Sequence, residues 1–248
     1  VMEHLAGTDL AGLVRTQGPL PVETAVLYLL HVCDGLAEAH AAGIVHRDIK
    51  PANLFLTTDA HGQSCVKILD FGIAKAGTES LTLSNRGMGS GGYMAPEQMR
   101  DVKGADARTD IWALGIVLFE LLSGRLPFEA DNLEGYVMRV FTGNATPLQA
   151  LRPEAPEALA AAISKCLMSD RDLRFATVAH LAHQLSPFAP LHARAYPERI
   201  ARRLGLQPGE VFSGSFPGDT VPATPVGLLR PTGAELVPFA ATTPASSI

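Results

Sequence analysis

Residues 110–123 constrain the fold more than any other segment, because almost every side chain in them is apolar. A helix that is apolar all around must be buried on every side, so other elements have to surround it. The run is broken by Glu120 and is too short to cross a membrane, which requires about 20 apolar residues. We therefore expect a buried core helix, and the 47% share of hydrophobic residues is sufficient to build a core around it.

Apolar residues at helical spacing predict further helices over residues 22–42, 133–141, 156–167 and 177–185. Two short apolar runs, residues 53–57 and 65–69, flank a turn-rich stretch at residues 59–62. This pattern predicts a small β-hairpin. Residues 1–186 are therefore expected to form one mainly α-helical domain with a single hairpin.

Proline sets the last quarter of the chain apart, since ten of the 18 prolines lie from Pro187 onward. Proline fixes φ and removes a backbone donor, so residues 187–248 are expected to be a Pro-rich, largely disordered linker or tail. Within this tail, Pro197 and Gly205 frame one segment whose ends suit a short helix.

Charge and cysteine usage exclude several classes of function. A net charge of −5 argues against general nucleic-acid coating. The three cysteines, Cys33, Cys65 and Cys166, are far apart and form no CxxC pair, which argues against a disulfide scaffold and a zinc site. They suit a reducing compartment, so we expect a cytoplasmic protein with no membrane segment in this chain.

The sequence H-R-D-I-K-P-A-N at residues 46–53 has the densest polar chemistry, and it lies between a predicted helix end and a hairpin strand. Asp70 follows the second strand. Asn53 and Asp70 supply hard oxygen ligands of the kind that Mg²⁺ prefers. Asp48 and Lys50 are two residues apart and could point into the same cleft. An aspartate beside a lysine and a metal site is suited to phosphoryl transfer.

This string resembles the H-R-D-L-K-P-x-N catalytic loop of protein kinases, and other signatures of that family follow in order. D-F-G occurs at residues 70–72, A-P-E at residues 95–97 and D-x-W-x-x-G at residues 110–115. The resemblance implies a protein-kinase-like fold. Residues 1–186 would form the mainly α-helical C-terminal lobe from the hinge onward, with the N-terminal β lobe missing.

The resemblance implies roles for residues near the transferred phosphate. Asp48 would take the proton of the acceptor hydroxyl, and Lys50 would contact the phosphate, as in kinases directed to Ser and Thr. Asn53 and Asp70 would hold Mg²⁺. Glu3 and Leu5 lie in the hinge-like residues 1–5, and with Phe55 under the adenine ring they would bind ATP.

Other matched positions imply structural roles. Asp110 would anchor the catalytic loop through backbone N–H groups, although an aspartate at a helix start could also be a simple N-cap. Glu97 would form a buried ion pair with Arg174. His46 would brace the backbone of the loop, and His40, near the preceding helix end, is expected to pack or cap.

Residues 70–97 resemble the activation segment. Arg47 directly precedes Asp48, which is the pattern of kinases that are switched by phosphorylation of this segment. We expect a phosphate on Thr82 or Ser84 to pair with Arg47. Ser90 keeps a hydroxyl that could bond the catalytic aspartate and lysine.

These matches predict a serine/threonine protein kinase that uses ATP and Mg²⁺ on Ser and Thr hydroxyls of proteins, with no nucleic-acid partner. Because the chain begins at the hinge, we expect poor activity from it alone, with the missing lobe or a partner covering the exposed cleft face. The alternative is a non-catalytic kinase-like module that binds a partner through that face. A metal-dependent phosphate-binding protein of another fold is the third interpretation.

Overall fold

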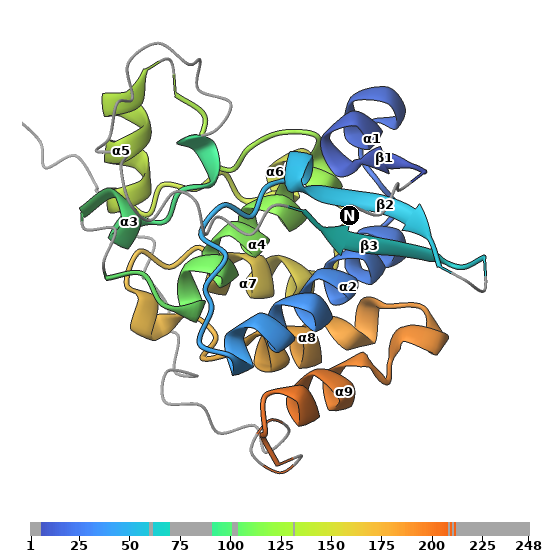
Figure 1. The fold of residues 1–248 in the computed structure, drawn as a ribbon. Coiled ribbons are helices and arrows are strands. Elements are labelled where there is room, and N and C mark those ends of the chain that lie inside the picture. The colour runs from blue at the N-terminus through green and yellow to red at the C-terminus, as the bar shows by residue number, and fades with distance from the viewer. Residues whose placement is uncertain are drawn as a thin grey trace, which may run out of the picture. The chain divides into compact units, whose positions relative to one another are not determined.

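The computed structural model describes residues 6–59, 62–69, 91–100, 104–130, 132–207, 209 and 211, all within one unit, Val1–Gly214. Helices dominate the described part of the chain (Figure 1). The helices are α1 (Leu10–Gln17), α2 (Val22–Ala41), α3 (Pro96–Arg100), α4 (Ala107–Ser123), α5 (Leu133–Thr142), α6 (Leu148–Leu151), α7 (Glu157–Cys166), α8 (Val178–Leu185) and α9 (Tyr196–Arg203). The strands are β1 (Thr8–Asp9), β2 (Leu54–Thr58) and β3 (Ser64–Ile68).

Helix α4 is the buried central helix that its apolar sequence predicts. Trp112 and Phe119 are almost fully buried, and the helix contacts α2, α6 and α7. It begins three residues earlier than expected, because the Asp106 side chain accepts a hydrogen bond from Arg108 N and caps the first turn. Gly124 ends it with a φ of 72°, a left-handed conformation that favours glycine.

The predicted hairpin is present as β2 and β3, with each strand displaced by about one residue from its expected bounds. A third strand, β1, pairs antiparallel with β2 and places Asp9 opposite Phe55. Two residues are too few to show the alternation by which strands are recognised in a sequence, so β1 was not predicted. Asp9 also caps α1, accepting from Gly12 N at 2.7 Å.

Helix α2 carries the chain from the sheet side of the domain to the predicted catalytic loop. It contacts β3, α4, α8 and α9, and Figure 1 shows it running between the sheet and α8. The helix ends at Ala41, and Gly43 adopts a φ of 74° where the chain turns away. Among the described residues, no helix is both long and apolar enough to cross a membrane.

The short helix expected near residues 197–205 is present as α9, and it belongs to the packed domain. It contacts α2 and α8, and Ile200 and Ala201 are buried. Arg199 and Arg203 both form ion pairs with Asp34 of α2. Composition predicts a tail over residues 187–248, whereas α9 and the residues around it pack on the helical core. Residues 208, 210 and 212–248 lie outside the described residues.

His31 links three elements at this packing surface. The residue is on α2, its Nδ1 accepts from Val66 N of β3 at 3.3 Å, and its ring lies 5.3 Å from that of Tyr196 on α9. Burial, and secondarily the charge of Arg199, lowers the pKa of His31 from 6.5 to about 4. The imidazole is therefore neutral in the folded protein at neutral pH.

This shift makes the free energy of unfolding depend on pH. Below pH 6.5 the unfolded chain gains a proton at His31 that the folded chain takes up only near pH 4. Stability should fall by up to about 1.4 kcal/mol per pH unit in this window. The free energy of unfolding can be measured by urea denaturation at pH 7.5, 6 and 5. In His31→Gln, which keeps an acceptor for Val66 N, this free energy should fall less with decreasing pH than in the wild type. Parallel pH profiles for the two proteins would contradict the prediction.

Candidate active site

Asp48, Lys50 and Asn53 meet in the loop that follows α2 and in the 3-10 turn Pro51–Asn53. Lys50 Nζ donates to both carboxylate oxygens of Asp48, at 3.1 and 2.9 Å. Asn53 Nδ2 donates to Asp48 O at 2.8 Å and to Asp48 Oδ2 at 3.1 Å. The side chains of Asp48 and Lys50 are 22% and 18% exposed, so solvent and a substrate can reach both.

The orientation of the Asn53 amide suits metal binding. Because Nδ2 points at Asp48, Oδ1 is the amide atom that could ligate a cation, and Mg²⁺ prefers such oxygens. Asn53 O also accepts from Leu69 N at 2.8 Å, which ties the loop to the residue before Asp70. Asp70, the second expected ligand, lies outside the described residues. Within the described ranges, no group of three or more His, Cys, Asp or Glu forms a metal site.

Asp110 holds the backbone of the predicted catalytic loop. The carboxylate is fully buried and accepts from Arg47 N at 2.8 Å and from His46 N at 3.0 Å. It lies in the first turn of α4, and Asp106 is the N-cap, so capping does not explain it. His40, expected only to pack or cap, places Nε2 2.8 Å from Asp110 Oδ2. Its position near the end of α2, six residues before His46, was the only hint in the sequence.

His46 braces the loop from inside. It is fully buried, and its Nδ1 accepts from Asp48 N at 3.3 Å. The Nε2 atom lies 3.3 Å from Leu69 O, to which it donates if Nδ1 is the acceptor. The imidazole therefore connects the backbone at Asp48 with the end of the hairpin.

Arg47 has an unusual backbone conformation for a residue with a large side chain. Its φ is 65°, the only positive φ among the described non-glycine residues, and this left-handed conformation costs about 1–2 kcal/mol. Two side chains hold it: Asp110 accepts from Arg47 N, and Gln98 Nε2 donates to Arg47 O at 2.9 Å. Arg47 Nε is buried, and none of the described residues accepts a hydrogen bond from it.

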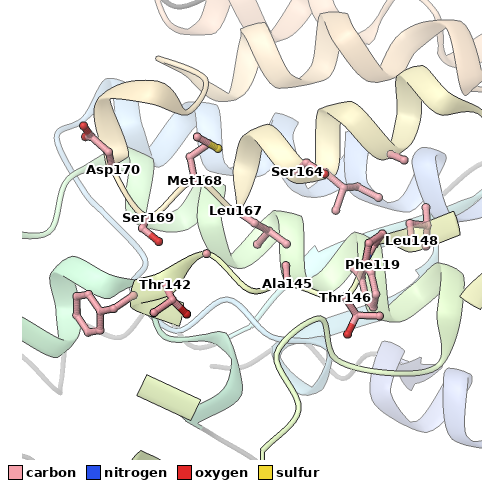
Figure 2. Close-up of a pocket in the computed structure, with 15 residues that line it drawn as sticks. Phe119, Thr142, Ala145, Thr146, Leu148, Ser164, Leu167, Met168, Ser169 and Asp170 are labelled. Atoms are coloured by element: carbon pink, nitrogen blue, oxygen red, sulfur yellow. The ribbon is translucent and has the colours of Figure 1, made fainter. Parts of the chain in front are cut away.

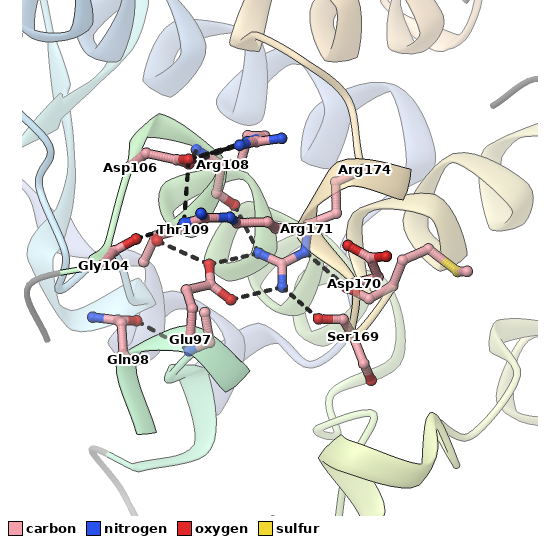
Figure 3. A network of polar contacts seen from close by, with 12 residues as sticks. Glu97, Gln98, Gly104, Asp106, Arg108, Thr109, Ser169, Asp170, Arg171 and Arg174 are labelled. Carbon is pink, nitrogen blue, oxygen red and sulfur yellow. Dashed lines mark hydrogen bonds and ion pairs between the residues drawn. The ribbon is translucent and has the colours of Figure 1, made fainter. Parts of the chain in front are cut away.

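Glu97 and Arg174 form a bidentate ion pair, with N–O distances of 2.8 and 2.9 Å (Figure 3). Arg174 also donates to backbone carbonyls of residues 108 and 168 and lies over the Trp112 ring, 4.9 Å from its centroid. Burial raises the pKa of Glu97, but the hydrogen bonds and charge of Arg174 outweigh it, and the net pKa is lowered. The pair fixes α3, the end of the predicted activation segment, to α4 and to the loop before α8.

Of the remaining predicted site residues, one lies on the sheet and the others lie outside the described residues. Phe55 is half-buried on β2, close to Gly7; a Cβ on Gly7 would lie 1.9 Å from Leu56 O, so only glycine fits there. Six predicted site residues lie outside the described residues: Glu3, Leu5, Asp70, Thr82, Ser84 and Ser90.

A separate cavity of about 440 Å³ lies among α4, α5 and α7 (Figure 2). Phe119, Ile163 and Leu167 form its apolar wall, and Thr142 and Asp170 are among its polar residues. None of the predicted site residues lines it, so the candidate active site is the Asp48 loop and not this cavity.

Comparison with known proteins connects this geometry to one family. The protein kinase domain family matches residues 1–186. A probable serine/threonine-protein kinase of Clostridium acetobutylicum is 36% identical over 187 residues, which are 75% of this chain and 28% of the relative. Serine/threonine-protein kinase Pkn1 of Myxococcus xanthus is 37% identical over 196 residues, which are 78% of this chain and 28% of the relative. The chain therefore spans less than a third of these relatives.

Solved structures share the fold. The Rad53 1–466 structure in complex with AMP-PNP superimposes with a TM-score of 0.58 at 27% identity, covering 76% of this chain and 46% of that chain. The Rad53 kinase domain with SCD2 and AMPPNP gives a TM-score of 0.61 at 24% identity, covering 77% of this chain and 69% of that chain.

Proposed function

This chain belongs to the protein kinase domain family, and on that premise we propose that it carries the phosphoryl-transfer residues of a serine/threonine kinase. The substrates would be Ser and Thr hydroxyls of proteins, and ATP would be the phosphoryl donor. One observation carries the proposal: Asp48 is held by Lys50 and Asn53 in a solvent-accessible loop that Asp110 anchors.

Each member of this cluster would have a distinct role. The acceptor hydroxyl oxygen would bond to the γ-phosphorus while the bond from that phosphorus to the β,γ-bridging oxygen breaks and ADP leaves. Asp48 would take the hydroxyl proton. Lys50, which donates to Asp48, would offset charge on the transferred phosphate.

Asn53 would contribute one ligand to Mg²⁺, and Asp70 another. An amide oxygen and a carboxylate fit this hard cation. When bound, Mg²⁺ would neutralise charge on the phosphate oxygens. Phe55 would lie under the adenine ring, with Glu3 and Leu5 at the adenine edge.

The described residues would supply one wall of the nucleotide cleft. In the family arrangement a lysine on a β-strand holds the α- and β-phosphates, and this sequence has no lysine before Lys50. We infer that the 248 residues alone transfer phosphate slowly, because the phosphates would remain solvated and poorly positioned. The function is therefore tested on the intact gene product.

The purified intact gene product should transfer label from γ-labelled ATP to protein substrates when Mg²⁺ is present. Acid hydrolysis should recover the label as phosphoserine and phosphothreonine. Transfer that is absent with every substrate tested, including autophosphorylation, would reject the kinase proposal. A partner bound without any transfer would then favour the alternative of a kinase-like binding module.

Phosphorylation of Thr82 or Ser84 would activate the enzyme, because the added phosphate would pair with Arg47, which directly precedes Asp48. Thr82→Ala/Ser84→Ala in the intact protein should lower kcat by about 5- to 150-fold, the usual range of such coupling. Thr78→Ala/Ser80→Ala is the matched control, since it removes two hydroxyls from the same segment. Full activity of the Thr82/Ser84 variant would contradict the prediction.

A further inference from the structure

Gln98 connects α3 with the predicted catalytic loop, and the proposed reaction requires these two parts to be held in a fixed relative position. It lies on α3, directly after Glu97, at the end of the predicted activation segment. Its Nε2 donates to Arg47 O at 2.9 Å, across 51 residues of sequence. Its Oε1 accepts from Ala95 N at 3.0 Å. Both ends of one buried amide are therefore used, one at the residue that directly precedes α3 and one on the predicted catalytic loop.

The amide orientation follows from these two partners. A flipped amide would place its NH₂ against the Ala95 N–H and its oxygen against the Arg47 carbonyl, so both hydrogen bonds would be lost. The residue is only 9% exposed, and water could not easily replace these bonds. The two bonds, to Ala95 N and Arg47 O, therefore set the side chain in one conformation.

The bonded carbonyl belongs to the peptide that leads directly into Asp48. Arg47 is in a left-handed conformation that a non-glycine residue adopts only when its surroundings hold it. Asp110 holds the N–H of Arg47, and Gln98 holds its C=O. Without Gln98, the Arg47 carbonyl would lose this donor, while Asp48 N on the other side of the same peptide would still donate to His46 Nδ1.

We propose that Gln98 is a positioning residue that couples the position of α3 to the orientation of the Asp48 side chain. This role rests on the proposed kinase function. When the Glu97–Arg174 pair holds α3 in place, the Gln98 amide fixes the peptide before Asp48. The fixed peptide in turn orients the Asp48 carboxylate. When α3 shifts, Arg47 O loses its donor and the aspartate loses its alignment. Gln98 touches neither ATP nor protein substrate in this role.

Gln98→Glu tests the donor alone, since the glutamate keeps an acceptor for Ala95 N but cannot donate to Arg47 O while ionised. In the intact protein, kcat should fall by about 10- to 100-fold with KM for ATP within about twofold, as expected for misaligned reacting groups. A protonated glutamate can donate again. The ratio of variant to wild-type kcat should therefore rise toward one as pH is lowered.

Gln98→Met removes both bonds at similar volume and should lower kcat at every pH, without recovery at low pH. The matched control is Arg152→Met, because Arg152 also bonds backbone carbonyls, those of Leu20 and Leu122. Arg152→Met should lower the thermal midpoint while leaving kcat within about twofold below that midpoint. A Gln98→Glu kcat within twofold of an active wild type, or a kcat ratio independent of pH, would overturn the proposal.

Amide hydrogen exchange separates this proposal from the kinase proposal, because it needs no activity. Exchange of residues 46–48 should be about tenfold faster or more in Gln98→Glu, and unchanged in Arg152→Met. Faster exchange in an inactive wild-type background would support the positioning contact and reject the kinase function. Unchanged exchange in Gln98→Glu would reject the positioning role.

Discussion

Replacing Asp48 with asparagine in the intact gene product should lower kcat by about 10²- to 10⁴-fold, the usual contribution of a general base. Asparagine has almost the same size and keeps an oxygen acceptor, so Lys50 can still bond the side chain. It cannot take the proton of the attacking hydroxyl, and its NH₂ group would face two other donors, Lys50 Nζ and Asn53 Nδ2. The KM for ATP should change little.

The measurement is steady-state transfer from γ-labelled ATP to a protein substrate, with folding checked by the thermal midpoint. Glu23→Gln is the matched control: it also exchanges one carboxylate for an amide, on the exposed first turn of α2. Its kcat should equal that of the wild type. A kcat for Asp48→Asn within tenfold of the wild type would mean that another group accepts the proton.

Replacing Arg174 with alanine should destabilise the fold by about 3–5 kcal/mol, the usual cost of removing one partner of a buried ion pair. The Arg174 side chain is 0% exposed and the Glu97 side chain is 13% exposed, so the remaining carboxylate would lose its charged partner in a poorly hydrated place, with the Thr109 hydroxyl still donating to it. The backbone carbonyls of Met168 and Arg108 would lose their donors as well. Loss of contact with Trp112 adds to the cost.

Urea unfolding of the two proteins measures this difference. Arg125→Ala is the control, because Arg125 forms an exposed i,i+4 pair with Glu129, and its loss should destabilise the fold far less. The pKa of Glu97 is lowered in the folded protein, so the stabilisation by Arg174 is present above the ordinary value of 4.5 and is lost as pH falls below it. Equal losses for the two arginine variants, or a difference that does not shrink as pH falls below 4.5, would contradict this account.

The hairpin and most helices could be predicted because their signals are local. The periodicity of residues 22–42 and the nearly continuous apolar run at 110–123 correspond to α2 and α4 within three residues at each end. Two features were not predicted, and each has a physical reason. β1 is only two residues long and shows no alternation. The helix α9 was predicted but its packing was not, because the composition of this Pro-rich stretch predicts a tail, although Ile200 supplies a buried side chain.

The sequence by itself determined the chemistry of the catalytic loop, since Asp48, Lys50 and Asn53 lie within six residues and any compact loop keeps them close. Only the tertiary structure decided how that loop is held. The bonds of Gln98 to Arg47 and of His40 to Asp110 span 51 and 70 residues and were not predicted, and the bond of Arg174 to Glu97, which spans 77 residues, was implied only by the family resemblance. Such contacts form only after distant elements pack, because packing selects the side-chain rotamers and excludes the water that would otherwise satisfy these groups.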